Sequence, residues 1–189
     1  MTAELTDKKI AFLVANEGIE QVELTEPWKA VEAAGGQPFL VAPDSGTAQA
    51  FNHLEAADSF EVDRTTGEIQ VDEFDGVVLP GGVANPDALR MDEPAITFLK
   101  AWAEAGKPIA AICHAPWTLV EAGLVRGRTL TSWPSLQTDI RNAGGTWVDE
   151  ELKVCTGAPS VLVTSRKPDD LPAFCAKLID VIAEATINA

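Results

Sequence analysis

Tyrosine is absent from this chain of 189 residues, and histidine, cysteine and basic residues are scarce. The chain has two histidines and three cysteines, and its 14 lysines and arginines face 29 aspartates and glutamates, which gives a formal net charge of −15. A surface this acidic repels phosphate groups, which argues against nucleic acid or an anionic membrane as a partner. Two histidines and no Cys-x-x-Cys pair provide too few ligands for a dedicated zinc site, so we expect no metal and no other cofactor.

Long apolar runs are also missing. No stretch approaches the ~18 apolar residues that a membrane span needs, and the start of the chain, MTAELTDKK, lacks the apolar core of a secretory signal. The cysteines, Cys113, Cys155 and Cys175, are odd in number and widely spaced, which does not fit a disulfide framework. The sequence therefore predicts a cytoplasmic protein with free thiols.

The chain does contain short apolar runs that alternate with amphipathic segments. We expect strands at residues 9–15, 38–42, 76–79, 108–112, 129–133, 147–155 and 161–164, and helices at 21–34, 92–105, 116–122, 134–143 and 171–182. We also expect a hairpin over residues 60–71 around Thr66-Gly67, and a kink or a late helix start at Pro27. This alternation predicts one α/β domain over residues 1–189, with a mainly parallel sheet covered on both faces.

The most informative motif is AAICHAPW, residues 110–117, in which Cys113 ends a predicted buried strand and a helix follows almost at once. A sharp strand-to-helix turn would expose the sulfur at the edge of the sheet, as in a nucleophile elbow. The helix N-terminus would favour the thiolate, and the amide N–H of His114 would face an oxyanion formed by attack on a carbonyl. From the pattern alone, a cysteine after a buried strand is more often a packing residue.

Two other segments follow predicted strands, and the carboxyl ends of parallel strands meet at one edge of a sheet. In Pro80-Gly81-Gly82, glycine permits a tight turn, and the Gly82 amide is a candidate second oxyanion donor. The acidic residues Glu17, Glu20, Glu23 and Glu26 are spaced by three, which places them on roughly one helix face, and at least two of them are expected to be solvated. A protonated glutamate near Cys113 would donate a hydrogen bond to the thiolate.

The remaining candidates are interpreted as structural. Cys155 follows an alternating strand and Cys175 lies on the apolar stripe of the last predicted helix, so both are expected to be packing residues. His53 lies in a loop segment and is expected at the surface or at an interface.

Taken together, ANEGIEQVELTEP, VVLPGG and AAICHAPW resemble the DJ-1/PfpI family in its PfpI-like branch, which includes cysteine peptidases and deglycase-like stress proteins. GGVANPDALR, RGRTLTSWPSLQTDIRNAG and WVDEE match as well, so the resemblance covers nearly the whole chain. It implies a flavodoxin-like three-layer sandwich with a cysteine nucleophile elbow. It also implies an active site between two subunits, and so at least a homodimer.

Carried over by position, the resemblance makes Cys113 the nucleophile and His114 the neighbouring histidine. It makes Asp87 the acidic residue that orients this histidine from the other subunit, and it assigns the backbone donors to Gly82 and His114. The family's other acidic positions fall on Glu23 and Glu20.

Glu23 matches the elbow glutamate, which is usually protonated and hydrogen-bonded to the thiolate, and Glu20 matches an acidic position near the same pocket. Where PfpI-like members often carry a tyrosine, this chain has Trp133, so a role of that phenol is lost or moved here.

Two functions follow as hypotheses. The first is a stress-response hydrolase that uses Cys113 on glyoxal-type carbonyls, on glycated groups or on peptides. The second is a redox sensor or protective protein that works through oxidation of Cys113. A glutamine amidotransferase is disfavoured, because that class takes a histidine from a downstream segment and this chain has none after His114.

Overall fold

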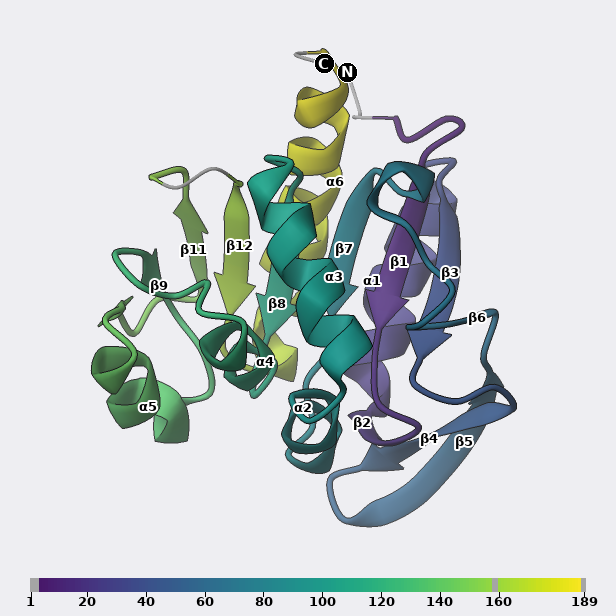
Figure 1. The fold of residues 1–189 in the computed structure, drawn as a ribbon, viewed down its shortest axis with the longest axis horizontal. Coiled ribbons are helices and arrows are strands. Elements are labelled where there is room, and N and C mark those ends of the chain that lie inside the picture. The colour runs from purple at the N-terminus through teal and green to yellow at the C-terminus, as the bar shows by residue number, and fades with distance from the viewer. Residues whose placement is uncertain (1–3, 158–159, 188–189) are drawn as a thin grey trace.

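The fold is that of a computed structural model, which describes residues 4–157 and 160–187. A seven-stranded sheet forms the centre, in the order β11-β12-β8-β7-β1-β3-β6 (Figure 1). Its strands are β1 (Lys9–Leu13), β3 (Gln37–Ala42), β6 (Arg64–Thr65), β7 (Gly76–Leu79), β8 (Ile109–Ile112), β11 (Leu152–Cys155) and β12 (Leu162–Ser165). All neighbours pair in parallel except β11 and β12. The sheet is thus mainly parallel, as predicted.

The order β3-β1-β7-β8-β12 is the 2-1-3-4-5 order of a flavodoxin-like sheet. In this order the chain reverses direction across the sheet between β1 and β7. Loops that leave the carboxyl ends of these two strands therefore diverge, and the crevice between them is where ligands bind in such sheets.

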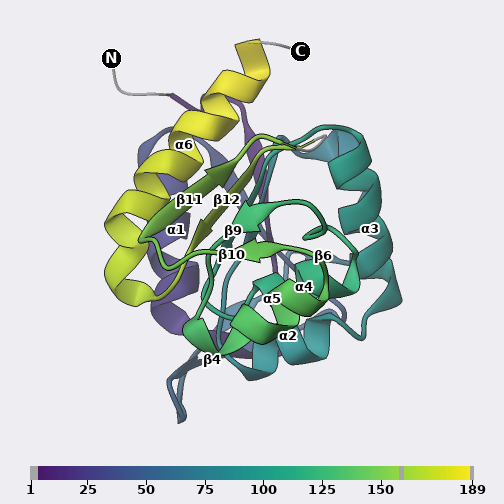
Figure 2. The ribbon, with the colours of Figure 1, turned by 90° about the vertical axis from the view of Figure 1, so that its left-hand side faces the viewer.

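Helices cover both faces of the sheet and make three layers (Figure 2). One face carries α1 (Gln21–Ala33) and α6 (Leu171–Ile187), and the other carries α2 (Ala84–Leu89), α3 (Glu93–Glu104) and α4 (Pro116–Glu121). The alternation along β1 explains this arrangement. Ile10 and Phe12 pack into the core under α1 and α6, whereas Ala11 and Leu13 pack into the core under α3.

The predicted hairpin over residues 60–71 is wrong. The hairpin lies earlier, where β4 (Thr47–Asn52) pairs with β5 (Glu55–Glu61) in an antiparallel ladder and β2 (Glu17–Glu20) adds to β4 in parallel. His53 makes the turn with a φ of +59°. The segment after β5 instead forms β6, which pairs in parallel with the end of β3.

The other differences are local. Helix α1 starts at Gln21, so Pro27 does not delay it and lies buried inside the helix. Helix α2 was not predicted. The strand expected at 129–133 is shortened to β9 (Thr129–Leu130), which pairs with β10 (Thr146–Trp147), and the following helix divides into a 3₁₀ turn (Pro134–Leu136) and α5 (Gln137–Asn142).

Within the described residues, no helix is both long and apolar enough to cross a membrane.

Candidate functional site

A cavity of about 710 Å³ opens at the carboxyl edge of the sheet, beside the reversal point between β1 and β7. It is lined by every residue that the sequence singled out for chemistry: Glu20, Glu23, Gly82, Asp87, Cys113 and His114. Three separate segments supply them: the β2–α1 junction, the loop after β7 together with α2, and the turn from β8 into α4. The sheet thus brings together side chains that lie far apart in the sequence.

Cys113 sits on the turn itself and has a φ of +62°, in the left-handed region that side chains other than glycine rarely adopt. Backbone hydrogen bonds hold it there. Its N–H donates to the carbonyl of Ser165 at 3.0 Å, and its carbonyl accepts from the N–H of Trp133 at 2.8 Å. Strain of this kind persists only where the surroundings enforce it, and here it aims the sulfur at the cavity.

Glu23, in the first turn of α1, is fully buried beside Cys113. Its Oε2 accepts the Gly81 N–H at 2.9 Å, while its buried Oε1 has no hydrogen-bond partner. Burial raises the pKa of Glu23 to about 8. The carboxyl group therefore holds its proton at neutral pH, as the resemblance implied.

The sulfur of Cys113 is under opposing influences. Burial raises the pKa of the Cys113 thiol, and the charge of an ionised Glu23 raises it further, whereas hydrogen bonds from the amides of Gly82 and His114 lower it. The sequence pointed to a helix terminus as the cause of a thiolate, but α4 is only six residues long and burial works against ionisation. The protonation state of Glu23 is thus a main control of the sulfur.

His114 follows Cys113 and lies between two tryptophans. Its ring stacks on Trp133 at 5.7 Å between centroids and meets the edge of Trp117 at 5.4 Å. Burial lowers the pKa of His114 to about 4, so the ring is neutral near pH 7. Its Nδ1 lies 3.2 Å from the Cys113 sulfur, where a neutral ring can accept the thiol proton.

Glu20 and Asp87 occupy the mouth of the cavity. The Oε2 of Glu20 accepts the backbone N–H of His53 at 3.1 Å and lies 3.9 Å from the His53 Nδ1. Asp87 is exposed on α2, and the described residues of the single chain show no hydrogen bond from it to His114. The four spaced glutamates do not share one helix face, since Glu17 and Glu20 lie on β2.

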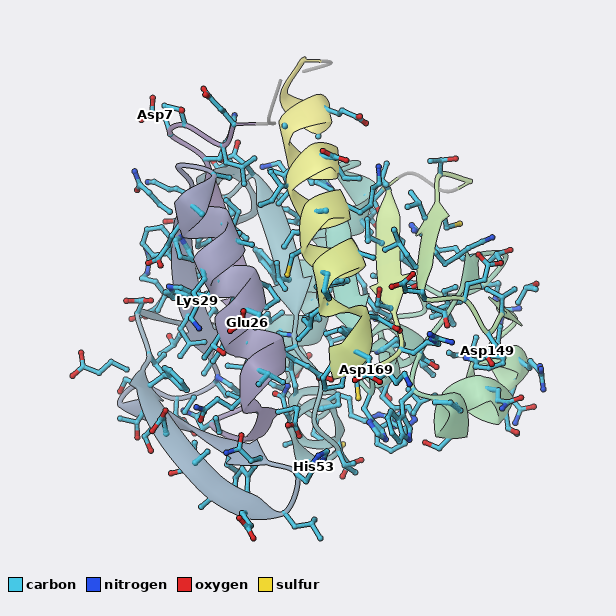
Figure 3. All side chains as sticks on the ribbon, turned by 180° about the vertical axis from the view of Figure 1, so that it is seen from behind. Asp7, Glu26, Lys29, His53, Asp149 and Asp169 are labelled. Atoms are coloured by element: carbon cyan, nitrogen blue, oxygen red, sulfur yellow. The ribbon has the colours of Figure 1, made fainter. Side chains whose placement is uncertain are left out.

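Sequence reasoning did not place His53 or Leu54 at the site. Both line the cavity from the tip of the β4–β5 hairpin, and Figure 3 shows His53 projecting at that end of the molecule. The hairpin itself was not predicted, so nothing in the sequence linked its tip to Cys113. Trp133 was noted as a departure from the family pattern, and the structure places its indole in the cavity wall.

Two glycines fit this wall closely. A Cβ at Gly81 would collide with the Glu23 carboxylate and would lie 2.7 Å from the Cys113 Cβ. Gly82 has a φ of +89°, and a Cβ there would collide with the Gly18 carbonyl. Only glycine lets this loop approach the sulfur closely enough for its amide to reach it.

A flavodoxin-like sheet with a cysteine on a strained strand-to-helix turn defines a class of α/β proteins that present a thiol at the sheet edge. Within that class, this chain belongs to the DJ-1/PfpI family, whose sequence profile matches residues 8–181.

Its relatives bear names of two kinds of enzyme and of a stress protein. "Protein/nucleic acid deglycase 2" of Escherichia coli is 40% identical over 167 residues, which cover 88% of this chain and 93% of that protein. In Bacillus subtilis, "General stress protein 18" is 38% identical over 88% of this chain and 93% of its own length. "Putative cysteine protease YraA" of the same organism is 35% identical, over 93% of this chain and 98% of its own length.

The fold has solved counterparts. The crystal structure of Drosophila melanogaster DJ-1beta superposes with a TM-score of 0.80 at 25% identity, and the match covers 97% of each chain. The flavodoxin-like sandwich expected from the resemblance is therefore confirmed.

Proposed function

We propose that the protein is a cysteine-dependent hydrolase of stress metabolism that converts glyoxal-type carbonyl compounds and their adducts to 2-hydroxy acids. One observation carries this proposal: the Cys113 sulfur faces the cavity with two amide donors, a neutral imidazole and a protonated carboxyl group around it. This set suits addition to a carbonyl followed by proton movement. The names of the relatives support the same kind of chemistry.

In the proposed reaction, Cys113 adds to the aldehyde carbon of a 2-oxoaldehyde while its proton passes to Nδ1 of His114. The new C–O⁻ is stabilised by the amides of Gly82 and His114. A proton then moves from the first carbon to a side-chain base, and one is returned to the second carbon, which turns the hemithioacetal into a 2-hydroxyacyl thioester. Water cleaves the thioester and restores the thiol, so 2-oxoaldehyde plus water gives one 2-hydroxy acid.

The direct test is incubation of the purified protein with methylglyoxal and no added cofactor, following loss of the aldehyde and gain of lactate. We expect one lactate for each methylglyoxal consumed. Cleavage of unmodified peptides without lactate formation would overturn the proposal in favour of a peptidase.

Redox sensing is the second candidate, because the unpartnered Oε1 of Glu23 is buried beside the sulfur. Two peroxides would convert Cys113 to a sulfinate with release of two waters, and the Glu23 O–H could donate to a sulfinate oxygen.

After mild peroxide, we therefore expect mass spectrometry to find two added oxygens on Cys113 before any on Cys155 or Cys175. Earlier oxidation of either of the other cysteines would rule out the sensor role.

We further propose that two chains associate at the mouth of the cavity, so that Asp87 of one chain orients His114 of the other. Three large apolar side chains stand exposed there, Leu54, Val83 and Trp133, and they would lose water on association. Sedimentation should give twice the chain mass of 20.1 kDa, and activity should fall on dilution as the dimer dissociates. A monomer with full activity would contradict this assignment.

A further inference from the structure

The cavity has a one-sided distribution of charge. Glu20, Glu23 and Asp87 line it together with His53 and His114, and among the described lining residues there is no lysine or arginine. Among these groups, His114 contributes no positive charge near neutral pH, because burial keeps its ring unprotonated. Because Glu23 holds its proton, the negative charge of the cavity comes from Glu20 and Asp87, and no lysine or arginine among the described lining residues offsets it.

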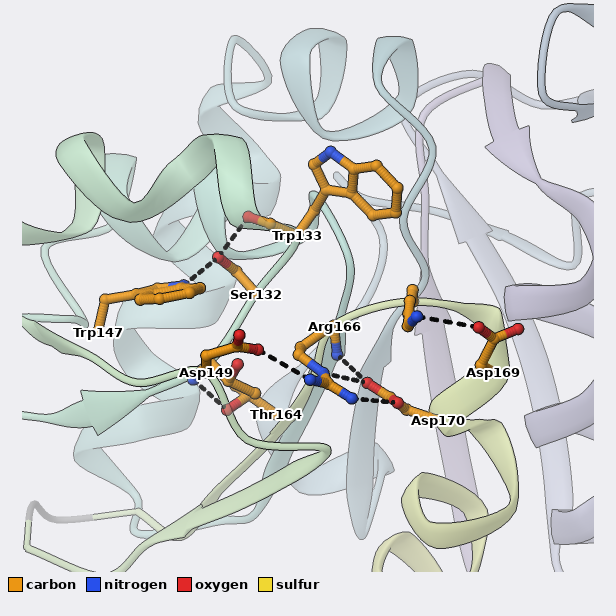
Figure 4. Close-up of polar contacts among 10 residues, drawn as sticks. Ser132, Trp133, Trp147, Asp149, Thr164, Arg166, Asp169 and Asp170 are labelled. Atoms are coloured by element: carbon orange, nitrogen blue, oxygen red, sulfur yellow. Dashed lines mark hydrogen bonds and ion pairs between the residues drawn. The ribbon is translucent and has the colours of Figure 1, made fainter.

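The cations next to the cavity are already paired. Arg166, two residues before the lining residue Pro168, donates from Nε to Asp170 at 2.9 Å and from Nη1 to Asp149 at 2.8 Å (Figure 4). Lys167 lies 3.0 Å from Asp169. A guanidinium paired with two carboxylates attracts an anionic ligand only weakly, because its charge is already compensated. These groups do not make the mouth of the cavity positive.

Two features of the wall favour a cation. Trp133 lines the wall, and aromatic faces attract cations through their π electrons. The side chain of Glu20 is only 13% exposed, so solvent screens its charge less than that of a surface carboxylate. Deeper in, the buried Oε1 of Glu23 has no partner, and as the O–H of a protonated carboxyl group it can donate a hydrogen bond to a ligand.

From this geometry we infer that the site selects for molecules that carry a positive charge beside the group that reacts with Cys113, and against anionic ones. This inference rests on the proposed function for the identity of the reacting carbonyl. What it adds is the positive charge next to that carbonyl. A substrate would carry this charge if the carbonyl adduct is formed on a cationic compound. A carboxylate within reach of such a charge changes the rate about threefold per unit charge at near-aqueous screening, and more where water is excluded.

The first experiment measures charge selection from the rate at which Cys113 is modified, so it does not require turnover. Three methanethiosulfonates, with a trimethylammonioethyl, a hydroxyethyl or a sulfonatoethyl group, react with a cysteine thiolate to form a mixed disulfide and release methanesulfinate. Each rate is measured by mass spectrometry at pH 7.5 in a Cys155→Ser/Cys175→Ser variant, so that only Cys113 reacts. Division by the rate with 2-mercaptoethanol removes the intrinsic differences among the reagents.

We expect Cys113 to prefer the positive reagent over the negative one about tenfold after this correction. Glu20→Gln should reduce the ratio about ninefold, to near one, whereas Glu17→Gln, the same change on the same strand but outside the cavity, should leave it unaltered. Added salt should bring the ratio of the two rates closer to one, because it screens the charges. A corrected ratio of one or less in the parent protein would overturn the inference.

A turnover experiment separates this inference from the proposed function. Methylglyoxal hemithioacetals of thiocholine and of its uncharged isostere 3,3-dimethylbutane-1-thiol differ only in charge, and we expect a higher kcat/KM for the charged one. If neither is consumed while the methanethiosulfonate ratio holds, the hydrolase proposal fails and the charge selection stands. Equal kcat/KM values for the two adducts would count against charge selection even in an active enzyme.

Discussion

Cys113→Ser should lower the turnover of methylglyoxal at least about a thousandfold, because a serine hydroxyl is a far weaker nucleophile than a thiol at this pH. The loss should be in kcat, since the cavity wall and the amide donors remain. The serine hydroxyl is smaller than the thiol and fits the same space, and the backbone bonds from position 113 to Ser165 and Trp133 remain, so the variant should fold. Lactate formation, measured with a circular dichroism spectrum as a check on folding, tests this.

Cys155→Ser and Cys175→Ser are the matched controls. Both cysteines are half-buried and lie outside the cavity, so each variant should keep its activity. Turnover by Cys113→Ser equal to that of the parent protein would show that the sulfur takes no part in the reaction.

Glu23→Gln should stabilise the fold at alkaline pH while disturbing the site. Burial raises the pKa of Glu23 from 4.5 to about 8, so the folded state holds a proton that the unfolded state has lost between these pH values. Stability therefore falls as pH rises through this window, by about 4 kcal/mol at pH 8 for this group. Glutamine never ionises, and its amide oxygen can still accept the Gly81 N–H, so the variant avoids this loss.

Urea unfolding at pH 4.5 and pH 8 provides the measurement. The gain in the free energy of unfolding of Glu23→Gln over the parent should be small at pH 4.5 and reach about 4 kcal/mol at pH 8. Glu26→Gln is the control, because Glu26 is exposed on the same helix and its ion pair with Lys29 is a surface contact worth about 0.5 kcal/mol or less. A gain at pH 8 no larger than that at pH 4.5 would mean that Glu23 is ionised in the folded protein.

The central sheet could be predicted because its strands carry their own signals. β1, β7 and β8 are short apolar runs that are buried on both faces, and Asp92 marks the start of α3 by accepting the Ala95 N–H at 3.0 Å. The ends of β8 and β7 place Cys113 and Gly82 at one edge, where Glu23 joins them from α1. For this reason the sequence located the candidate site as well as the fold.

The β4–β5 hairpin could not be predicted in the same way. Its strands carry alanines, glutamines and acidic residues in place of branched apolar ones, and only Ala48 and Ala50 are fully buried. Its support is tertiary: β4 pairs with β2, and Ala48, Ala50 and Phe60 pack against the core under α1 and α6. The direction of the pKa shift of the Cys113 thiol could not be predicted from the sequence either, because it depends on how deeply α1 and the Gly81 loop bury the sulfur.

The two edge strands of the central sheet bear on how the chain avoids aggregation. At one margin β6 is two residues long, and beyond it the Asp63 side chain accepts the Leu40 N–H at 2.7 Å while the Asp63 N–H donates to the Leu40 carbonyl at 2.9 Å. At the other margin β11 runs against the direction of its neighbours and is four residues long. Edge strands this short offer few unpaired backbone N–H and C=O groups to which a strand of another molecule could add. The sheet is therefore poorly suited to growing into fibrils, and the strong negative charge of the chain reinforces that protection.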